Sequence, residues 1–413
     1  MIVRSYFKCL TCDQINVFRV QIGHSNIQKH EIACIECYEN LAFNLHLNQS
    51  LGDIEGFETI ENCELIKRKN VNNYDELPVR YLSDEILASK SEISSELSFP
   101  SGRVVHNIME MIKSGNLSNF EIQSQPHVSI VDDWEILRKA WNLENNNKKD
   151  LSIEKLASLS FKDGLLDLDV ESALYEFIYK FLSVSDNSLS LFENALNFTQ
   201  TIARTELNEL KEHYKSVKSD RMRRALDIFL QFFNNFSQFS QVKFSEYLPE
   251  DLVVTSKSFE KVKMFYGNCF EHITSNIETL ACLNNIVEGR NFDQFESMNL
   301  KKYNKIDKSN KANPLKNNSN YYNLFKDIDS QLRNASHHGH IFCEEDTVKY
   351  RLNNGQDYKE ISYTDYLKKC TSIFHSFCIL TAIEIYLDKI AFIETKKANG
   401  LNPLAQAIKQ ANL

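Results

Sequence analysis

Glycine and proline are scarce in this chain, with 11 glycines and 6 prolines among 413 residues. Few helix breakers, together with many Leu, Ile, Phe, Glu and Lys residues, favour a mostly helical body. The chain is too long for one typical hydrophobic core, so we expect two or three domains.

Two further absences narrow the class of protein. The first 13 residues, MIVRSYFKCLTCD, lack the apolar segment of a signal peptide, and charges interrupt later apolar runs before they reach membrane length. We therefore expect a cytoplasmic protein with no membrane partner. The net charge is −9, so any contact with nucleic acid needs a local basic patch or a dimer groove.

The chain divides by its hydrophobic pattern. The segments QINVFRVQI and NLAFNLHLN alternate apolar and polar side chains, which is the period of a half-buried strand. This predicts a β-rich domain over 1–80, followed by a Ser- and Glu-rich linker over 81–102. Helical spacing then predicts a helical middle region over 103–250 and a helical bundle over 251–413.

Five segments are expected in the C-terminal region. They are one long helix (255–289), a mobile Lys- and Asn-rich loop (299–320), a helix (320–339), a β-hairpin turning at Asn354-Gly355 and a closing helix (363–397). The loop is either plainly solvated or folds over bound RNA. The basic segment 218–225 is likewise either a solvated face or a contact to RNA phosphate.

The ten cysteines include two C-x2-C pairs, Cys9 with Cys12 and Cys34 with Cys37. The 21 intervening residues include strand-like segments, and two such turns brought together provide the four thiolates of a tetrahedral zinc site. The pattern resembles a zinc ribbon, so we expect structural Zn²⁺ and no catalysis there. His24 and His30 are spare candidate ligands. The ribbon either only stabilises its domain or also contacts nucleic acid or a partner protein.

A cluster of histidines follows one arginine in QLRNASHHGHIF, residues 331–342. Arg333 and His337 are four residues apart and would share a helix face. Gly339 is a good residue to follow a helix end, so the helix is expected to end at 337 or 338. A histidine metal site and a helix end without chemistry are two interpretations of the cluster.

A third interpretation rests on a resemblance. Arg333, Asn334 and His338 form R-N-x3-H, which resembles the R-x4-6-H signature of the HEPN superfamily, and His340 fits the long end of that range. The resemblance implies a metal-independent endoribonuclease whose composite site needs a homodimer. In this reading Arg333 holds the scissile phosphate, Asn334 orients the pair and His338 moves the proton of the RNA 2′-hydroxyl, with His337 and His340 as alternatives for that role.

The expected fold class is mainly α. It combines a C-terminal HEPN-like helical bundle, carrying a β-hairpin insertion, with a small β-rich N-terminal zinc ribbon. The expected function is RNA cleavage in antiviral defence or as a toxin, with tRNA, mRNA and rRNA all open as substrates and no catalytic metal. Two rivals stay open: a non-catalytic module that binds nucleic acid or protein, and an adaptor that assembles with a regulatory partner protein.

Overall fold

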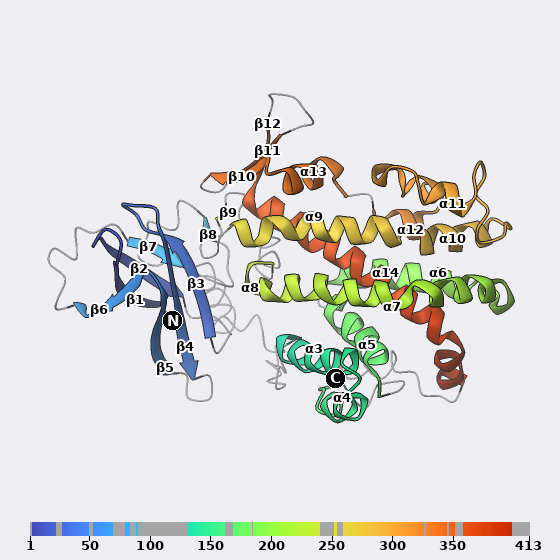
Figure 1. Ribbon diagram of the computed structural model, residues 1–413, viewed down its shortest axis with the longest axis horizontal. Coiled ribbons are helices and arrows are strands. Elements are labelled where there is room, and N and C mark those ends of the chain that lie inside the picture. Colours follow the sequence, from blue (N-terminus) through green and yellow to red (C-terminus); the bar gives the residue numbers. More distant parts are fainter. Residues whose placement is uncertain are drawn as a thin grey trace, which may run out of the picture. The chain divides into compact units, whose positions relative to one another are not determined.

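A computed structural model describes most of the chain (Figure 1). The described residues are 2–21, 27–48, 53–68, 79–82, 88–89, 130–161, 168–183, 185–239, 252–253, 259–325, 328–344, 347–351 and 358–398. The chain divides into two compact units. The first comprises Met1–Ile122, Asn235–Met264 and Asn334–Thr371, and the second comprises Gln123–Asn234, Phe265–Arg333 and Ser372–Leu413. This division is discontinuous, unlike the consecutive boundaries expected at 80, 102 and 250.

Two small sheets form the N-terminal part of the first unit. One has the order β6-β1-β2-β7, with β1 Ile2–Cys9, β2 Ile15–Gln21, β6 Cys63–Ile66 and β7 Val79–Leu82. The other has the order β3-β4-β5, with β3 Ile27–Ala33, β4 Asn40–Asn48 and β5 Asp53–Glu61. The strands predicted from alternation are confirmed. Their shared core includes Phe7 and Phe43, whose rings stack at 4.1 Å, and Leu82, which lies beyond the boundary expected at 80.

The first unit also contains a three-stranded sheet near its C-terminal end. Its order is β10-β11-β12, with β10 Ile341–Glu344, β11 Thr347–Arg351 and β12 Tyr358–Ser362. Strands β11 and β12 confirm the two arms of the predicted hairpin, while its Asn354-Gly355 turn lies outside the described residues. Strand β10 was not predicted. Two further strands pair with each other: β8 Ala88–Ser89, within the expected linker, and β9 Leu252–Val253. Helix α8 Phe236–Phe239 is a single short turn.

Helices make up the second unit, and the chain is mainly α as predicted. They are α3 Ile130–Asn145, α4 Lys149–Leu156, α5 Val170–Leu182, α6 Asp186–Gln200, α7 Arg204–Asn234 and α10 Glu278–Val287. Helices α9 Phe259–Asn276 and α14 Tyr363–Ala398 belong partly to each unit. The core is aromatic: Phe232 stacks on Phe374 at 3.7 Å, and Trp134 stacks on Phe233 at 4.9 Å.

Three expectations about the C-terminal region are wrong. The single helix expected over 320–339 is instead two helices, α12 Ser319–Tyr322 and α13 Ser330–His338. The long helix over 255–289 is instead α9 followed by α10, with Ile277 between them. The hydroxyl of Thr274 donates to the carbonyl of Phe270 at 2.8 Å, a bond that bends helices. The mobile loop expected over 299–320 is instead a series of short helices. They are α11 Leu300–Tyr303, η4 Lys308–Asn310, η5 Asn313–Leu315 and α12 Ser319–Tyr322. Several of their side chains and of the residues between them are buried, including Tyr303 and Lys311.

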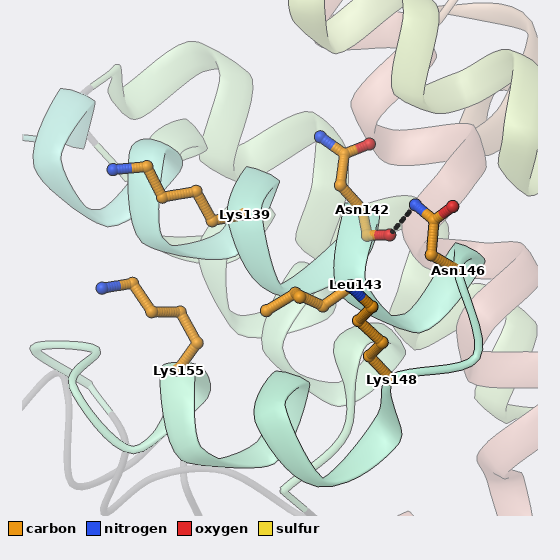
Figure 2. A pocket seen from close by; sticks show the side chains of 6 residues that line it. All are labelled: Lys139, Asn142, Leu143, Asn146, Lys148 and Lys155. Carbon is orange, nitrogen blue, oxygen red and sulfur yellow. Dashed lines mark hydrogen bonds between the residues drawn. The ribbon is translucent and has the colours of Figure 1, made fainter.

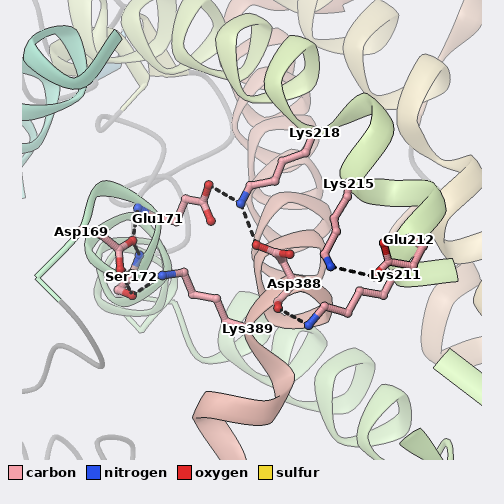
Figure 3. Close-up of polar contacts among 9 residues, drawn as sticks. All are labelled: Asp169, Glu171, Ser172, Lys211, Glu212, Lys215, Lys218, Asp388 and Lys389. Carbon is pink, nitrogen blue, oxygen red and sulfur yellow. Dashed lines mark hydrogen bonds and ion pairs between the residues drawn. The ribbon is translucent and has the colours of Figure 1, made fainter. Parts of the chain in front are cut away.

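Polar contacts join α5, α7 and α14 (Figure 3). Lys218 of α7 reaches Glu171 at 2.6 Å and Asp388 at 2.7 Å. Lys389 of α14 binds Asp169, which caps α5 by accepting from the backbone N–H groups of residues 171 and 172. Lys218 is therefore not a plain solvated residue, because two carboxylates of its own unit hold its ammonium group.

Helix α14 bears on the membrane expectation. Among the described residues, its stretch Tyr363–Lys389 is long and apolar enough to cross a membrane, so the expectation that charges interrupt every such run is wrong here. Within its most apolar window, 83% of the residues are buried inside the protein. That burial is typical of the core helix of a globular protein.

Candidate functional site

The four predicted zinc ligands converge. The sulfur atoms of Cys9, Cys12, Cys34 and Cys37 all lie within 4.8 Å of one another. The Sγ atoms of Cys9 and Cys37 are 3.7 Å apart, and those of Cys12 and Cys34 are 3.6 Å apart. Four thiolates at about 2.3 Å from one zinc ion, arranged tetrahedrally, would be separated by about 3.8 Å. The cluster therefore has the dimensions of a closed tetrahedral metal site.

Each cysteine pair lies on a turn of the same design. The backbone N–H of Asp13 donates to the carbonyl of Cys9 at 3.0 Å, and that of Tyr38 donates to the carbonyl of Cys34 at 3.1 Å. Asp13 and Tyr38 have φ values of 63° and 62°, a conformation that closes each turn. The two turns thus present both thiols of each pair to one point.

Two asparagines support the cluster from outside, and neither was identified from the sequence. The side-chain amide of Asn16 lies 3.4 Å from Cys34 Sγ, and that of Asn62 lies 3.7 Å from Cys9 Sγ. Arg80 donates to Asn16 Oδ1 at 2.5 Å and so orients its amide. Amide donors near thiolates stabilise negative charge and orient the metal ligands.

Hydrogen bonding prepares Cys34 to act as a thiolate. Burial alone would raise the pKa of its thiol, but the backbone N–H groups of Cys37 and Glu36 and the Asn16 amide together lower that pKa to about 6. Deprotonated sulfur is the form that binds metal. His30 lies in the ribbon core against Phe43 and is outside the ligand cluster, while His24 lies outside the described residues.

The residues of the HEPN-like motif occupy one helix, α13 Ser330–His338. Asp329 caps it by accepting from the backbone N–H groups of residues 331 and 332. The helix ends as predicted: Gly339 has a φ of 69°, and the N–H of His340 donates to the carbonyl of Ala335 at 3.1 Å. His340 therefore does not continue the helical face but starts the connection to β10.

Arg333 is anchored by an acidic residue that sequence reasoning missed. Its guanidinium forms an ion pair with Glu271 of α9, and Lys308 of η4 pairs with the same carboxylate. One glutamate carboxylate thus contacts two cations. Burial, and secondarily the charge of Arg333, lower the pKa of Lys308.

The histidines differ in their surroundings. His337 is half-buried, and its Nε2 atom is buried without a hydrogen-bond partner. His338 is the last residue of α13, and the position of its side chain lies outside the description. His340 is exposed, and its carbonyl accepts from the N–H of Arg351 at 3.0 Å. Asn334 is half-buried on the same helix.

A second arginine lies in the interior of the helical unit. Arg221, from the basic segment 218–225, is only 7% exposed and binds Glu278 and Glu384. Nearby His272 is 8% exposed, and burial together with the charges of Arg221 and Arg224 lowers its pKa to about 4. Both earlier interpretations of this segment, a solvated face and a phosphate contact, are therefore wrong for Arg221.

One pocket of the second unit has a basic lining. It lies between α3 and α4, has a volume of about 540 Å³, and contains none of the predicted site residues (Figure 2). Its lining consists of Lys139, Lys148, Lys155, Asn142, Asn146 and Leu143. Ammonium and amide donors without a carboxylate in the lining suit an anion.

Comparison of the chain with protein-family models, with curated proteins and with solved structures found no match. The class that the chain itself defines is a mainly α protein with a four-cysteine candidate metal centre.

Proposed function

We propose that this protein is a HEPN-type endoribonuclease, acting as an effector of antiviral defence or as a toxin. It would cleave RNA by attack of the RNA 2′-hydroxyl group on the adjacent phosphate. The observation that carries the proposal is a single helix, α13, that bears Arg333, Asn334 and His338 in the R-N-x3-H order. The exposure of Arg333 adds support, because its side chain is 26% exposed and its guanidinium has the planar donor geometry that suits a phosphate.

The proposed reaction needs no group beyond RNA and the protein's side chains. The 2′-oxygen forms a bond to the adjacent phosphorus, and the bond from phosphorus to the 5′-oxygen breaks. His338 accepts the 2′-hydroxyl proton, and a protonated imidazole returns a proton to the leaving 5′-oxygen. Arg333 balances the charge that develops on the phosphate. The products are a 2′,3′-cyclic phosphate and a 5′-hydroxyl end.

The proposal includes a homodimer and a structural zinc ion. Two copies of α13 facing each other across a two-fold axis would supply two arginines and two histidines to one composite site. Zinc bound to Cys9, Cys12, Cys34 and Cys37 would stabilise the ribbon and take no part in cleavage. If zinc is bound, elemental analysis should find one equivalent of zinc per wild-type chain. The Cys34→Ser variant should have lost it.

The first test is cleavage of total cellular RNA by the purified, zinc-loaded protein, with EDTA present and zinc content checked afterwards. The ends are mapped for 2′,3′-cyclic phosphate. We expect cleavage by the wild-type protein and by two controls, Arg223→Ala and His46→Ala, which remove residues outside the motif. Arg333→Ala and His338→Ala should each cleave at least about 100-fold more slowly than the wild-type protein. Cleavage that survives both of these substitutions would overturn the proposal.

A second candidate function is a non-catalytic module that binds nucleic acid or protein. The observation that favours it is the same ion pair, because Glu271 occupies the guanidinium that the reaction needs. Under this function the wild-type protein binds RNA or a partner protein without cutting RNA, and His338→Ala leaves that binding unchanged.

A further inference from the structure

The sheet that follows the motif helix presents an unusual outer face. Phe342 is 36% exposed and Tyr358 is 42% exposed, although both are large aromatic residues. Their rings contact edge to face, with centroids 5.5 Å apart and an interplanar angle of 73°. Aromatic side chains gain free energy from burial, so a solvent-exposed pair on a sheet is a candidate contact surface.

Strand register shows which residues share this face. Phe342 pairs with Lys349, Lys349 pairs with Glu360, and Arg351 pairs with Tyr358. Because side chains alternate along a strand, these five residues point to the same side. The opposite side contains Ile341, Val348 and Tyr350, each at most 2% exposed. The sheet therefore has one face committed to the core and one face that carries two rings, two cations and the carboxylate of Glu360.

The arginine on this face is available to a ligand. Its guanidinium lies 5.2 Å from the ring centre of Tyr358 and donates to the Tyr358 hydroxyl at 2.9 Å. No ion pair joins Arg351 to a carboxylate among the described residues, although its Nε atom is buried and has no hydrogen-bond partner. Lys349, in contrast, lies 3.4 Å from Glu360. Within the described part of the chain, Arg351 is thus oriented by a ring and has no carboxylate partner.

This end of the sheet is directly connected to the motif. The backbone N–H of Arg351 donates to the carbonyl of His340, two residues after His338. Glu344, which pairs with Thr347, lies at the other end of the strands. Positive charge and aromatic surface therefore coincide at the end that adjoins the histidines.

We propose that Phe342, Tyr358 and Arg351 form a platform for single-stranded RNA, on which unpaired bases stack while Arg351 contacts phosphate. This inference rests on the proposed endoribonuclease function and specifies its substrate as RNA with unpaired bases beside the cleavage point. Exposed aromatic rings interleaved with cations are the usual means of binding single strands, since every base offers a flat face. A duplex keeps its bases stacked internally and cannot use the rings.

Binding is measured separately from cleavage, in the full-length protein with the additional substitution His338→Ala. The probes are a fluorescent 12-nucleotide single-stranded RNA and a blunt duplex that contains the same strand, followed by fluorescence anisotropy. We expect the double variant Phe342→Ala/Tyr358→Ala to bind the single strand about 10-fold or more weakly. Leu151→Ala, which removes an exposed apolar side chain of α4, is the matched control and should stay within about two-fold of the parent.

Each outcome decides the inference. Unchanged affinity in the double variant overturns it, as does equal weakening of single-strand and duplex binding, or absence of single-strand binding by the parent. With His338 intact, the double variant should raise KM and leave kcat within about three-fold. Cleavage that depends on Arg333 and His338 but not on the rings would retain the proposed function and reject the platform. Binding that depends on the rings, without any cleavage, would retain the platform and reject the proposed function.

Discussion

Arg221 and Arg333 are both arginines of the helical unit that bind glutamate, yet their surroundings differ. Arg221 lies in the interior between Glu278 and Glu384, so two negative charges face one positive charge. The side chain of Arg333 is 26% exposed, and it shares the single carboxylate of Glu271 with Lys308. The first arginine is 7% exposed, and the second can still be reached by solvent. Burial thus distinguishes an arginine held inside the unit from the one that we propose contacts phosphate.

The largest expected effect is on the buried arginine. Arg221→Met would leave two buried carboxylates without their cation, and breaking a buried pair in this way costs about 3–5 kcal/mol of unfolding free energy. Urea denaturation measures the change. Arg223→Met, at a side chain that is 75% exposed, is the matched control and should change stability by less than about 0.5 kcal/mol. Equal stability of both variants would mean that the buried network is not structural.

Arg333→Ala should have a large effect on cleavage and a small effect on stability. Loss of a guanidinium that stabilises transition-state charge lowers the cleavage rate by about 10²–10³-fold. Its half-exposed ion pair with Glu271 contributes about 1 kcal/mol or less to stability. Cleavage kinetics and urea denaturation on the same preparation measure both quantities. A variant that unfolds as easily as Arg221→Met would place Arg333 in the structural class.

His272 makes the buried network sensitive to pH. Its folded pKa, about 4, lies below its ordinary value of 6.5, so the unfolded chain takes up a proton that the folded chain excludes. This contribution to stability is therefore complete above pH 6.5, is lost as pH falls towards 4, and amounts to about 3 kcal/mol in total. Unfolding measured at intervals between pH 7 and 4 tests it. His272→Gln should flatten that profile, and a profile identical to wild type would refute the assignment.

Glu271→Gln should have the smallest effect of these substitutions, and it tests most directly how Arg333 differs from Arg221. It removes the carboxylate that competes with phosphate for Arg333, so RNA binding in the His338→Ala background should tighten several-fold. Stability should change by no more than about 1 kcal/mol. Glu135→Gln, at another acid paired with an arginine, is the control. Weaker binding by Glu271→Gln would instead make Glu271 a positioning residue for Arg333.

Local patterns predicted local structure well. Alternating apolar residues predicted β2 and β4, helical spacing predicted α14, and Gly339 predicted the end of α13. Prediction was poorer where composition was the main guide. The Lys- and Asn-rich stretch 299–320 looked solvated because few of its residues are apolar, but its Tyr303 and Leu315 are fully buried and hold it as short helices.

For the candidate metal centre, the sequence alone determined the ligands, because the spacing within each C-x2-C pair is a property of one turn. It also predicted that Arg333, Asn334 and His338 lie on one helix that ends before Gly339, because helical spacing and a terminating glycine are local signals. Only the tertiary structure decided that Asn16 and Asn62 support the thiols, that Glu271 anchors Arg333 and that Arg221 is buried. These partners lie far apart in the chain, and no local spacing relates them: long-range packing alone places a carboxylate beside an arginine.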